Sequence, residues 1–238
     1  MTAAQVATVV ERATGTAEIA PDPGGVAPSK AAGPVKVSAA DGSTLSVGLP
    51  ASDATNGVTS SQGTVVYPHA AGSTSLAVQP LADGGVRALV VVEDASAPAD
   101  YRFGLDLPSG SVVRQQDDGS AVIVRNGETL GKFEAPWAVD ARGRSVPTRY
   151  RFEHGALVQT VDFDAGTAFP VVADPSWKGV KKRAKAALKN SNTSTVAGAV
   201  GGCVAGAIAG VIGCGPGAAT GAVGGFLKGA IEGAVKGH

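Results

Sequence analysis

The fold is decided by residues 86–134, which read VRALVVVEDASAPADYRFGLDLPSGSVVRQQDDGSAVIVRNGETLGKFE. Short runs rich in β-branched residues, such as 86–93 and 121–125, alternate here with turn residues, and no run carries the 3.6-residue period of a helix. The pair Asn126-Gly127 separates AVIVR from ETLGKF, and both residue types accept the positive φ of a type I′ turn. The stretch therefore predicts antiparallel hairpins.

The same pattern continues outward on both sides. It predicts an all-β antiparallel, sandwich-like domain over residues 35–177. The Ala-, Pro- and Gly-rich segment before it, residues 1–34, is expected to be a flexible leader or linker, in which residues 5–13 have room for one or two helical turns. The remaining strand candidates are 35–38, 44–48, 64–67, 75–79, 101–107, 111–115, 129–134, 148–152, 157–162 and 168–172.

Composition excludes several functional classes. The chain has 44% hydrophobic residues, 17% charged residues and no net charge, which fits neither a charge-driven disordered chain nor a polybasic nucleic-acid binder. Three His and two Cys are too few for the common multi-ligand zinc clusters. The sequence also lacks the GxSxG, HExxH, P-loop and dinucleotide GxGxxG motifs, so we expect neither an enzyme nor a small-molecule cofactor.

The charges are unevenly distributed along the chain. Residues 1–177 contain 12 Lys and Arg against 19 Asp and Glu, a balance of −7. Residues 178–238 contain eight Lys and Arg against the single Glu232, a balance of +7. An acidic body joined to a cationic tail favours either docking of one on the other or an anionic partner for the tail. Two unrelated solvated surfaces are the alternative.

The tail begins with WKGVKKRAKAALKN at residues 177–190. At helical spacing its apolar residues share one face, which predicts a basic amphipathic helix over 178–190 that suits an anionic membrane surface. The alternative is a solvated linker helix with Trp177 docked on the β domain. The adjacent residues Lys181, Lys182 and Arg183 are also a candidate processing site. The basic residues of this segment are Lys178, Lys181, Lys182, Arg183, Lys185 and Lys189.

Glycine recurs at every fourth position through the rest of the tail, in two series separated at Pro216. Such a stripe weakens a helix in water but lets two helices approach closely in lipid. Residues 195–213 would span ~28 Å as a helix, close to the thickness of the hydrocarbon core. Residues 191–238 are therefore predicted to form a glycine-zipper helical hairpin that inserts into a bilayer and self-associates. The positions expected to pack are Gly198, Gly202, Gly206, Gly210, Gly217, Gly221, Gly225 and Gly229.

Cys203 and Cys214 are the two cysteines of the chain. An even pair in an exported protein suggests a disulfide. On one continuous helix the two residues would lie ~16 Å apart, beyond the reach of a disulfide, so a bridge requires the helix to break between them. Two free, small core cysteines are the alternative.

Five motifs follow one another in the β-rich region: TVVYP at 64–68, YRFGLDL at 101–107, QQDDGSAVIV at 115–124, FEAPWAVDARG at 133–143 and FPVVADPSW at 169–177. In this order they resemble the β-rich module of secreted actinobacterial proteins of the Rhs/YD-repeat, wall-associated type. The resemblance implies an extracellular, all-β, non-catalytic module that precedes an effector or repeat region.

The tail resembles another family. After its cationic start it reads GAVGGCVAGAIAGVIGCGPGAATGAVGG, which in composition and spacing is similar to glycine-zipper class II bacteriocins of the colicin V and cerein 7B-like sort. That resemblance implies permeabilisation of bacterial membranes.

These observations favour a secreted, two-part bacterial protein, in which the acidic β domain carries or masks a cationic, membrane-active tail. Its partners would be an anionic lipid bilayer and further copies of itself, with no role for nucleic acid. The alternative is a structural or binding protein of the cell envelope, whose C-terminal hairpin only anchors or oligomerises it. Either hypothesis places the protein outside the cell or in the envelope, although residues 1–25 show no secretion-signal pattern.

Overall fold

The computed structural model describes residues 1–22 and 25–179, which contain one helix, α1 (Ala3–Thr14), and fifteen strands. Every strand pair is antiparallel, so the prediction of an antiparallel β-rich domain is confirmed. The strands are β1 (Pro34–Ser38), β2 (Thr44–Gly48), β3 (Val58–Thr59), β4 (Val65–Tyr67), β5 (Thr74–Pro80), β6 (Val86–Val92), β7 (Asp100–Asp106), β8 (Ser111–Gln115), β9 (Ala121–Arg125), β10 (Glu128–Phe133), β11 (Ala138–Val139), β12 (Thr148–Glu153), β13 (Ala156–Val161), β14 (Val171–Ala173) and β15 (Ser176–Gly179).

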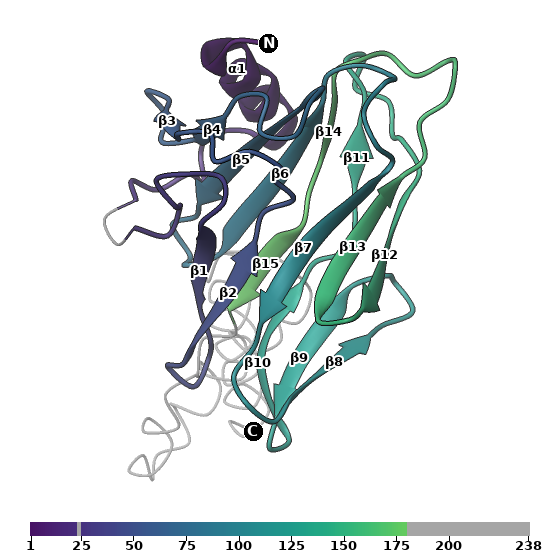
Figure 1. The fold of residues 1–238 in the computed structure, drawn as a ribbon. Helices are drawn as coiled ribbons and strands as arrows, with labels where there is room; N and C mark the ends of the chain where they lie inside the picture. Colours follow the sequence, from purple (N-terminus) through teal and green to yellow (C-terminus); the bar gives the residue numbers. More distant parts are fainter. Residues whose placement is uncertain (23–24, 180–238) are drawn as a thin grey trace, which may run out of the picture. The chain divides into compact units, whose positions relative to one another are not determined.

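The strands form two sheets with the main core between them (Figure 1). The smaller sheet has the order β1-β2-β7-β13-β12. The larger sheet follows β3-β4-β5-β6-β15-β10-β9-β8, with β14 paired to β6 and β11 paired to β14. Phe103 and Leu157 of the smaller sheet and Leu76, Val90 and Trp177 of the larger one are buried in this core.

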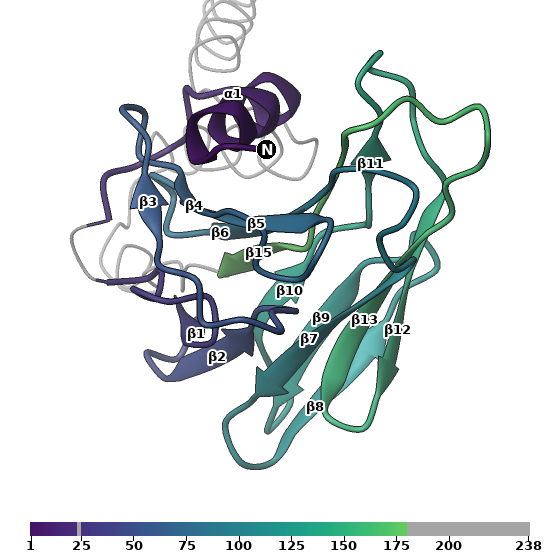
Figure 2. The ribbon, with the colours of Figure 1, turned by 45° about the horizontal axis from the view of Figure 1, so that its top comes forward.

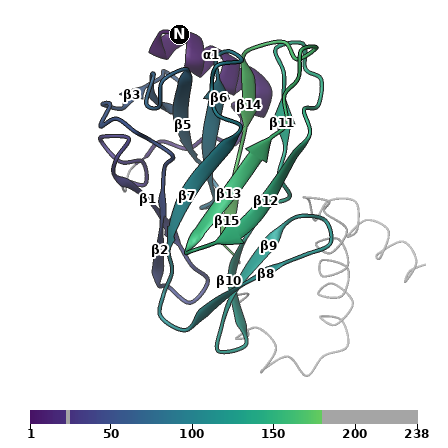
Figure 3. The same ribbon diagram turned by 45° about the vertical axis from the view of Figure 1, so that its right-hand side comes forward.

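Helix α1 covers the outer face of the larger sheet (Figure 2). Its first turn is closed by a capping box, in which the Thr2 side chain accepts from the Gln5 N–H and the Gln5 side chain accepts from the Thr2 N–H. Val6 and Val10 are fully buried on one stripe and pack with Leu89, Val91 and Val172 of the sheet. The segment 1–34, which we expected to be a flexible leader, therefore starts with a packed helix, seen next to β5 and β6 in Figure 3.

The hairpin predicted at Asn126-Gly127 is confirmed. Arg125 of β9 lies opposite Glu128 of β10, and the two residues between them have φ of 52° and 80°. Positive φ at both central positions is what a type I′ turn requires, and its twist matches that of the strands. Three strands were not predicted, β3, β11 and β15, each of four residues or fewer.

The last two strands, β14 and β15, run through the middle of the larger sheet. Ala173 of β14 lies opposite Val90, and Ser176 of β15 lies opposite Arg87, so the two strands follow β6 in one unbroken register. Pro175 interrupts the ladder because proline has no N–H to donate. We call residues 171–179 the final segment. On its other side it pairs with β11 and then with β10, so it has neighbours along both edges.

Candidate functional site

Of the site residues predicted from the sequence, the structure describes one, Lys178. The others lie outside the described residues, so the predicted helical hairpin, its glycine stripes, the candidate processing site and the cysteine pair stay predictions. They are Lys181, Lys182, Arg183, Lys185, Lys189, Gly198, Gly202, Gly206, Gly210, Gly217, Gly221, Gly225, Gly229, Cys203 and Cys214. No helix in the described part of the chain is long and apolar enough to cross a membrane.

Lys178 lies in a strand, which corrects the predicted start of the basic helix. It belongs to β15, opposite Lys132 of β10, and its Nζ is 3.8 Å from Glu134 Oε1. Its neighbour Trp177 is 1% exposed and contacts Phe133 edge to face, with 5.1 Å between ring centroids. Adjacent residues of a strand point to opposite faces. Burial of Trp177 in the core therefore turns Lys178 toward solvent and extends the β domain to residue 179.

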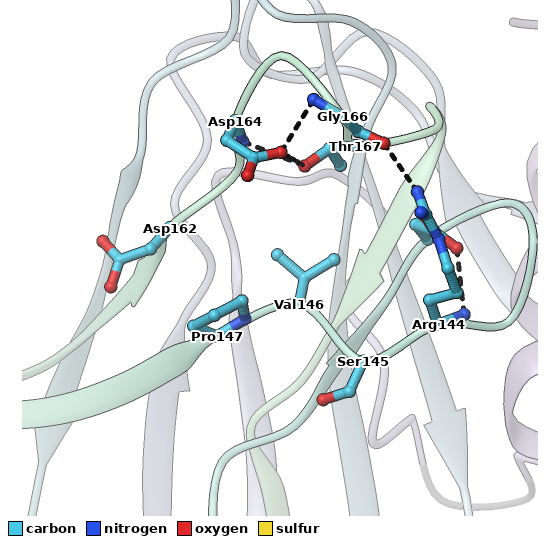
Figure 4. Close-up of a pocket in the computed structure, with 9 residues that line it drawn as sticks. Arg144, Ser145, Val146, Pro147, Asp162, Asp164, Gly166 and Thr167 are labelled. Atoms are coloured by element: carbon cyan, nitrogen blue, oxygen red, sulfur yellow. Dashed lines mark hydrogen bonds and ion pairs between the residues drawn. The ribbon is translucent and has the colours of Figure 1, made fainter.

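A pocket of about 250 Å³ opens beside the start of β12 (Figure 4). It combines three carboxylates, one guanidinium and two hydroxyl groups, which are group types that binding and catalytic sites use. The residues that line it are Asp140, Arg144, Ser145, Val146, Pro147, Asp162, Asp164, Gly166 and Thr167.

The Asp140 carboxylate holds the loops around this pocket together. Its Oδ1 accepts from the Arg142 and Arg144 N–H groups at 2.9 Å each, and its Oδ2 accepts from the Arg144 guanidinium at 2.7 and 2.9 Å. The Ala168 N–H donates to Oδ2 as well. Burial alone would raise the pKa of Asp140, but these hydrogen bonds outweigh it and lower the pKa to about 2. The Arg144 guanidinium also donates to the Gly166 carbonyl.

The other two carboxylates are engaged in the same way. Asp162 forms an ion pair with Arg149. Asp164 Oδ1 accepts from the Gly166 N–H at 2.8 Å and from the Thr167 hydroxyl at 3.1 Å, and these bonds lower the pKa of Asp164. Among residues 1–22 and 25–179, no group of three or more His, Cys, Asp and Glu side chains could hold a metal ion. The three carboxylates of the pocket are thus already engaged by neighbouring groups of the domain.

A second polar cluster lies inside the final segment, around Asp174. This carboxylate is fully buried. The Ser176 hydroxyl donates to its Oδ2 at 2.5 Å, and the Trp137 N–H donates to its Oδ1 at 3.2 Å. The Tyr150 hydroxyl lies 3.2 Å from the Asp174 carbonyl oxygen and 3.4 Å from Oδ1. Burial raises the pKa of Asp174 to about 7, although the hydrogen bonds from Ser176, Trp137 and Tyr150 act in the opposite direction.

A bulge places Asp174 next to Trp137. Phe133 lies opposite Trp177, and Ala138 lies opposite Ala173. Between these pairs, the four residues 134–137 face the three residues 174–176. The Asp174 side chain fills this mismatch, because its carboxylate accepts the Trp137 N–H that a regular ladder would pair with a carbonyl.

Sequence reasoning did not single out this cluster. Asp174 and Ser176 belong to the FPVVADPSW motif of the family resemblance, and Tyr150 belongs to the strand candidate 148–152, but none of the three was predicted to be a site residue. One signal was available: an Asp-Pro-Ser sequence inside an otherwise apolar run places a carboxyl, a ladder interruption and a hydroxyl where a strand should be buried.

Comparisons with protein-family models, with curated proteins and with solved structures find no match to this chain.

Proposed function

We propose that residues 1–179 form a carrier domain and that the residues after it are a cationic, membrane-active segment of a secreted bacterial protein. The observation that carries this proposal is the change of chemistry at the end of β15. The chain has a balance of −6 up to Gly179, with 13 Lys and Arg against 19 Asp and Glu, and of +6 after it, with seven Lys and Arg against one Glu, and the positive part is rich in glycine and alanine. Opposite charges on two parts of one chain favour one part carrying the other until it meets an anionic surface.

The position of the final segment supports a carrier role. It pairs with β6 along one edge and with β10 and β11 along the other, and Trp177 lies in the core. The tail is therefore attached to a strand that the domain holds by hydrogen bonds on both sides, rather than to a loosely held terminus.

The proposed mechanism has two steps. Lysines and Arg183 between residues 181 and 189 would bind anionic headgroups, each contributing about 1 kcal/mol near a charged membrane surface. Helices with glycine at every fourth position would then insert and pack closely through the glycine stripes. Because Gly and Ala favour insertion less than Leu or Ile, such helices suit a segment that enters the membrane only after contact.

Dye release from liposomes tests the proposal. The full chain and a chain that ends at Gly179 would be compared on anionic and on zwitterionic vesicles. We expect leakage from the full chain only, stronger on anionic lipid, and loss of leakage with Gly202→Leu plus Gly206→Leu. The matched control is Val204→Leu plus Ala207→Leu, which at 100° per residue falls on the opposite side of the same helix and should leak like the parent.

Two other outcomes are informative. Binding to vesicles without leakage would favour the alternative, a protein of the envelope whose tail is only an anchor. If the full chain binds neither type of vesicle, even at low salt where electrostatic attraction is strongest, both membrane functions are contradicted.

A further inference from the structure

We propose that the Pro175–Ser176 peptide bond is a site of self-cleavage, with Ser176 as nucleophile and Asp174 as general base. The inference goes beyond the proposed membrane role and does not depend on it, since it rests on groups inside the folded domain. It adds a covalent step by which the domain and the tail could separate.

The nucleophile and the base are already in contact. The Ser176 hydroxyl donates to Asp174 Oδ2 at 2.5 Å, within the distance over which a base takes a proton from a serine. Both residues are buried, Asp174 completely and Ser176 with 6% of its surface exposed. Bulk water therefore does not compete with the serine for the carboxylate.

Two further groups orient the base, a role that one group plays in other activated serines. The Trp137 N–H donates to Asp174 Oδ1, and the Tyr150 hydroxyl approaches the same oxygen at 3.4 Å. These contacts occupy Oδ1 and leave Oδ2 to the serine. Burial raises the pKa of Asp174 to about 7, so near neutral pH the carboxyl can both accept a proton and return it.

The carbonyl under attack also has a donor in place. The Ala88 N–H of β6 donates to the Pro175 carbonyl oxygen at 2.9 Å. Negative charge develops on that oxygen when the carbonyl carbon becomes tetrahedral, and a fixed backbone N–H stabilises it. Because β6 pairs with both β14 and β15, this donor is held rigidly.

The reaction consumes one water and is complete in two stages. In the first stage, Ser176 Oγ bonds to the Pro175 carbonyl carbon while its proton moves to Asp174 Oδ2. The C–N bond then breaks, and the Ser176 nitrogen takes that proton and becomes a free amine, which leaves an ester between Pro175 and Ser176 Oγ. In the second stage one water molecule, which reaches the ester through the exposed 6% of Ser176, hydrolyses it. This yields a carboxylate at Pro175, restores the Ser176 hydroxyl and releases a proton, which the new Ser176 amine takes up.

The two products should remain associated. Residues 176–179 pair with β6 and β10, and Trp177 is buried against Phe133. The fragment that begins at Ser176 would therefore leave the domain only when this short strand is displaced. The site thus converts a covalent attachment into a reversible one without a protease.

Mass spectrometry of the purified full chain, incubated between pH 6 and pH 8, tests the proposal. We expect two fragments, 1–175 and 176–238, that together weigh one water more than the parent. Their rate of appearance should not depend on protein concentration, because the reaction is intramolecular. Hydroxylamine at neutral pH should accelerate the reaction and leave a hydroxamate at Pro175. Fragment masses separate this cut from hydroxylamine cuts at Asn56-Gly57 or Asn126-Gly127.

Four variants assign the roles. Ser176→Ala should abolish the cut, and Asp174→Asn should slow it by about 100-fold or more, the usual contribution of a general base. Ser176→Cys should form a thioester instead, so its cleavage should respond to dithiothreitol. The matched control is Ser75→Ala, which removes another buried serine that donates to a carboxylate, Glu93, at 2.5 Å in the same sheet and should cleave like the parent.

Several results would overturn the proposal. It is contradicted if the folded full chain stays intact in neutral hydroxylamine, if Ser176→Ala is cut at the parent's rate, or if the cut falls at another bond. If circular dichroism shows that Ser176→Ala does not fold, Ser176→Cys provides the test. A folded Ser176→Cys variant whose cleavage rate does not change with dithiothreitol contradicts the mechanism. A chain that cleaves but never permeabilises vesicles keeps this proposal and contradicts only the membrane function.

Discussion

The indole ring of Trp177 packs against the backbone of Gly131. A Cβ added at this position would lie 2.2 Å from Trp177 Cζ2 and 2.8 Å from the Lys178 carbonyl oxygen, far inside contact distance. Leu130 is the extra residue of a bulge in β10, so the strand bends where the indole lies across it. Glycine is needed here for the space it leaves rather than for its backbone freedom.

Gly131→Ala should therefore destabilise the domain. We expect the free energy of unfolding to fall by about 2–3 kcal/mol, as for other overpacked cores. Urea unfolding, followed by tryptophan fluorescence, measures this change. Gly104→Ala in β7 is the control, because nothing lies within 4 Å of a Cβ there, and it should be neutral or slightly stabilising. Equal losses for both variants would refute the role of the Trp177 contact.

Asp174 should make stability depend on pH. Its pKa rises from 3.8 in the unfolded chain to about 7 in the fold. At pH values between these two, the unfolded state releases the proton first, so stability is greatest below about pH 4 and is lost as pH rises through 7. One pKa unit corresponds to about 1.4 kcal/mol, so the loss is on the order of 4 kcal/mol at most.

Asp174→Asn should remove this dependence because the amide stays neutral. We expect variant and parent to unfold at similar urea concentrations near pH 4.5 and the parent to become relatively weaker toward pH 8. Asp140→Asn should show the opposite trend, because the lowered pKa of Asp140 stabilises the fold above about pH 4 and that contribution is lost toward pH 2. A difference between Asp174→Asn and parent that stays constant with pH would exclude burial of a titrating Asp174.

Among the elements, α1 shows how a weakly patterned segment is stabilised by packing. Its apolar residues form one stripe, and the burial of this stripe against Leu89, Val91 and Val172 of the sheet stabilises the helix. Val6→Ala plus Val10→Ala should lower the free energy of unfolding by about 2–3 kcal/mol in urea titrations. Thr8→Ala, which changes an exposed β-branched residue of the same helix, should alter it by less than about 0.5 kcal/mol. A similar loss of unfolding free energy for Thr8→Ala would show that helix propensity, and not packing, stabilises α1.

The strands differ in how far they could be predicted. β2, β8 and β9 have the predicted bounds, because alternation and Gly- or Asn-containing turns mark both ends. β15 was missed since Pro175 lies directly before it and a run of lysines follows, two signals that normally end a strand. Its pairing with β6 and β10 outweighs those local preferences.

At the scale of the whole molecule, the domain should be complete at Gly179 and incomplete at Asp174. A chain ending at Gly179 keeps the final segment, and we expect it to melt at the same temperature as the β domain of the full chain. A chain ending at Asp174 lacks Trp177 and leaves parts of β6 and β10 unpaired, so it should show no cooperative transition. Circular dichroism melting curves measure both; a cooperative transition for the shorter chain near that of the longer one would show that β15 is dispensable.

By itself, the sequence determined the β-rich class, twelve of the fifteen described strands and the hairpin at Asn126-Gly127, because alternation and turn chemistry are properties of adjacent residues. It also determined the opposite charges of the two parts of the chain. Only the tertiary structure decided that residues 171–179 run through the middle of a sheet, and that Asp174 meets Trp137 and Tyr150. Trp137 and Tyr150 lie 37 and 24 residues away along the chain, and no local pattern specifies which distant segment will lie alongside. The candidate site depends on that pairing, because a strand with neighbours on both edges shields the Asp174 carboxylate and the Ser176 hydroxyl from bulk water.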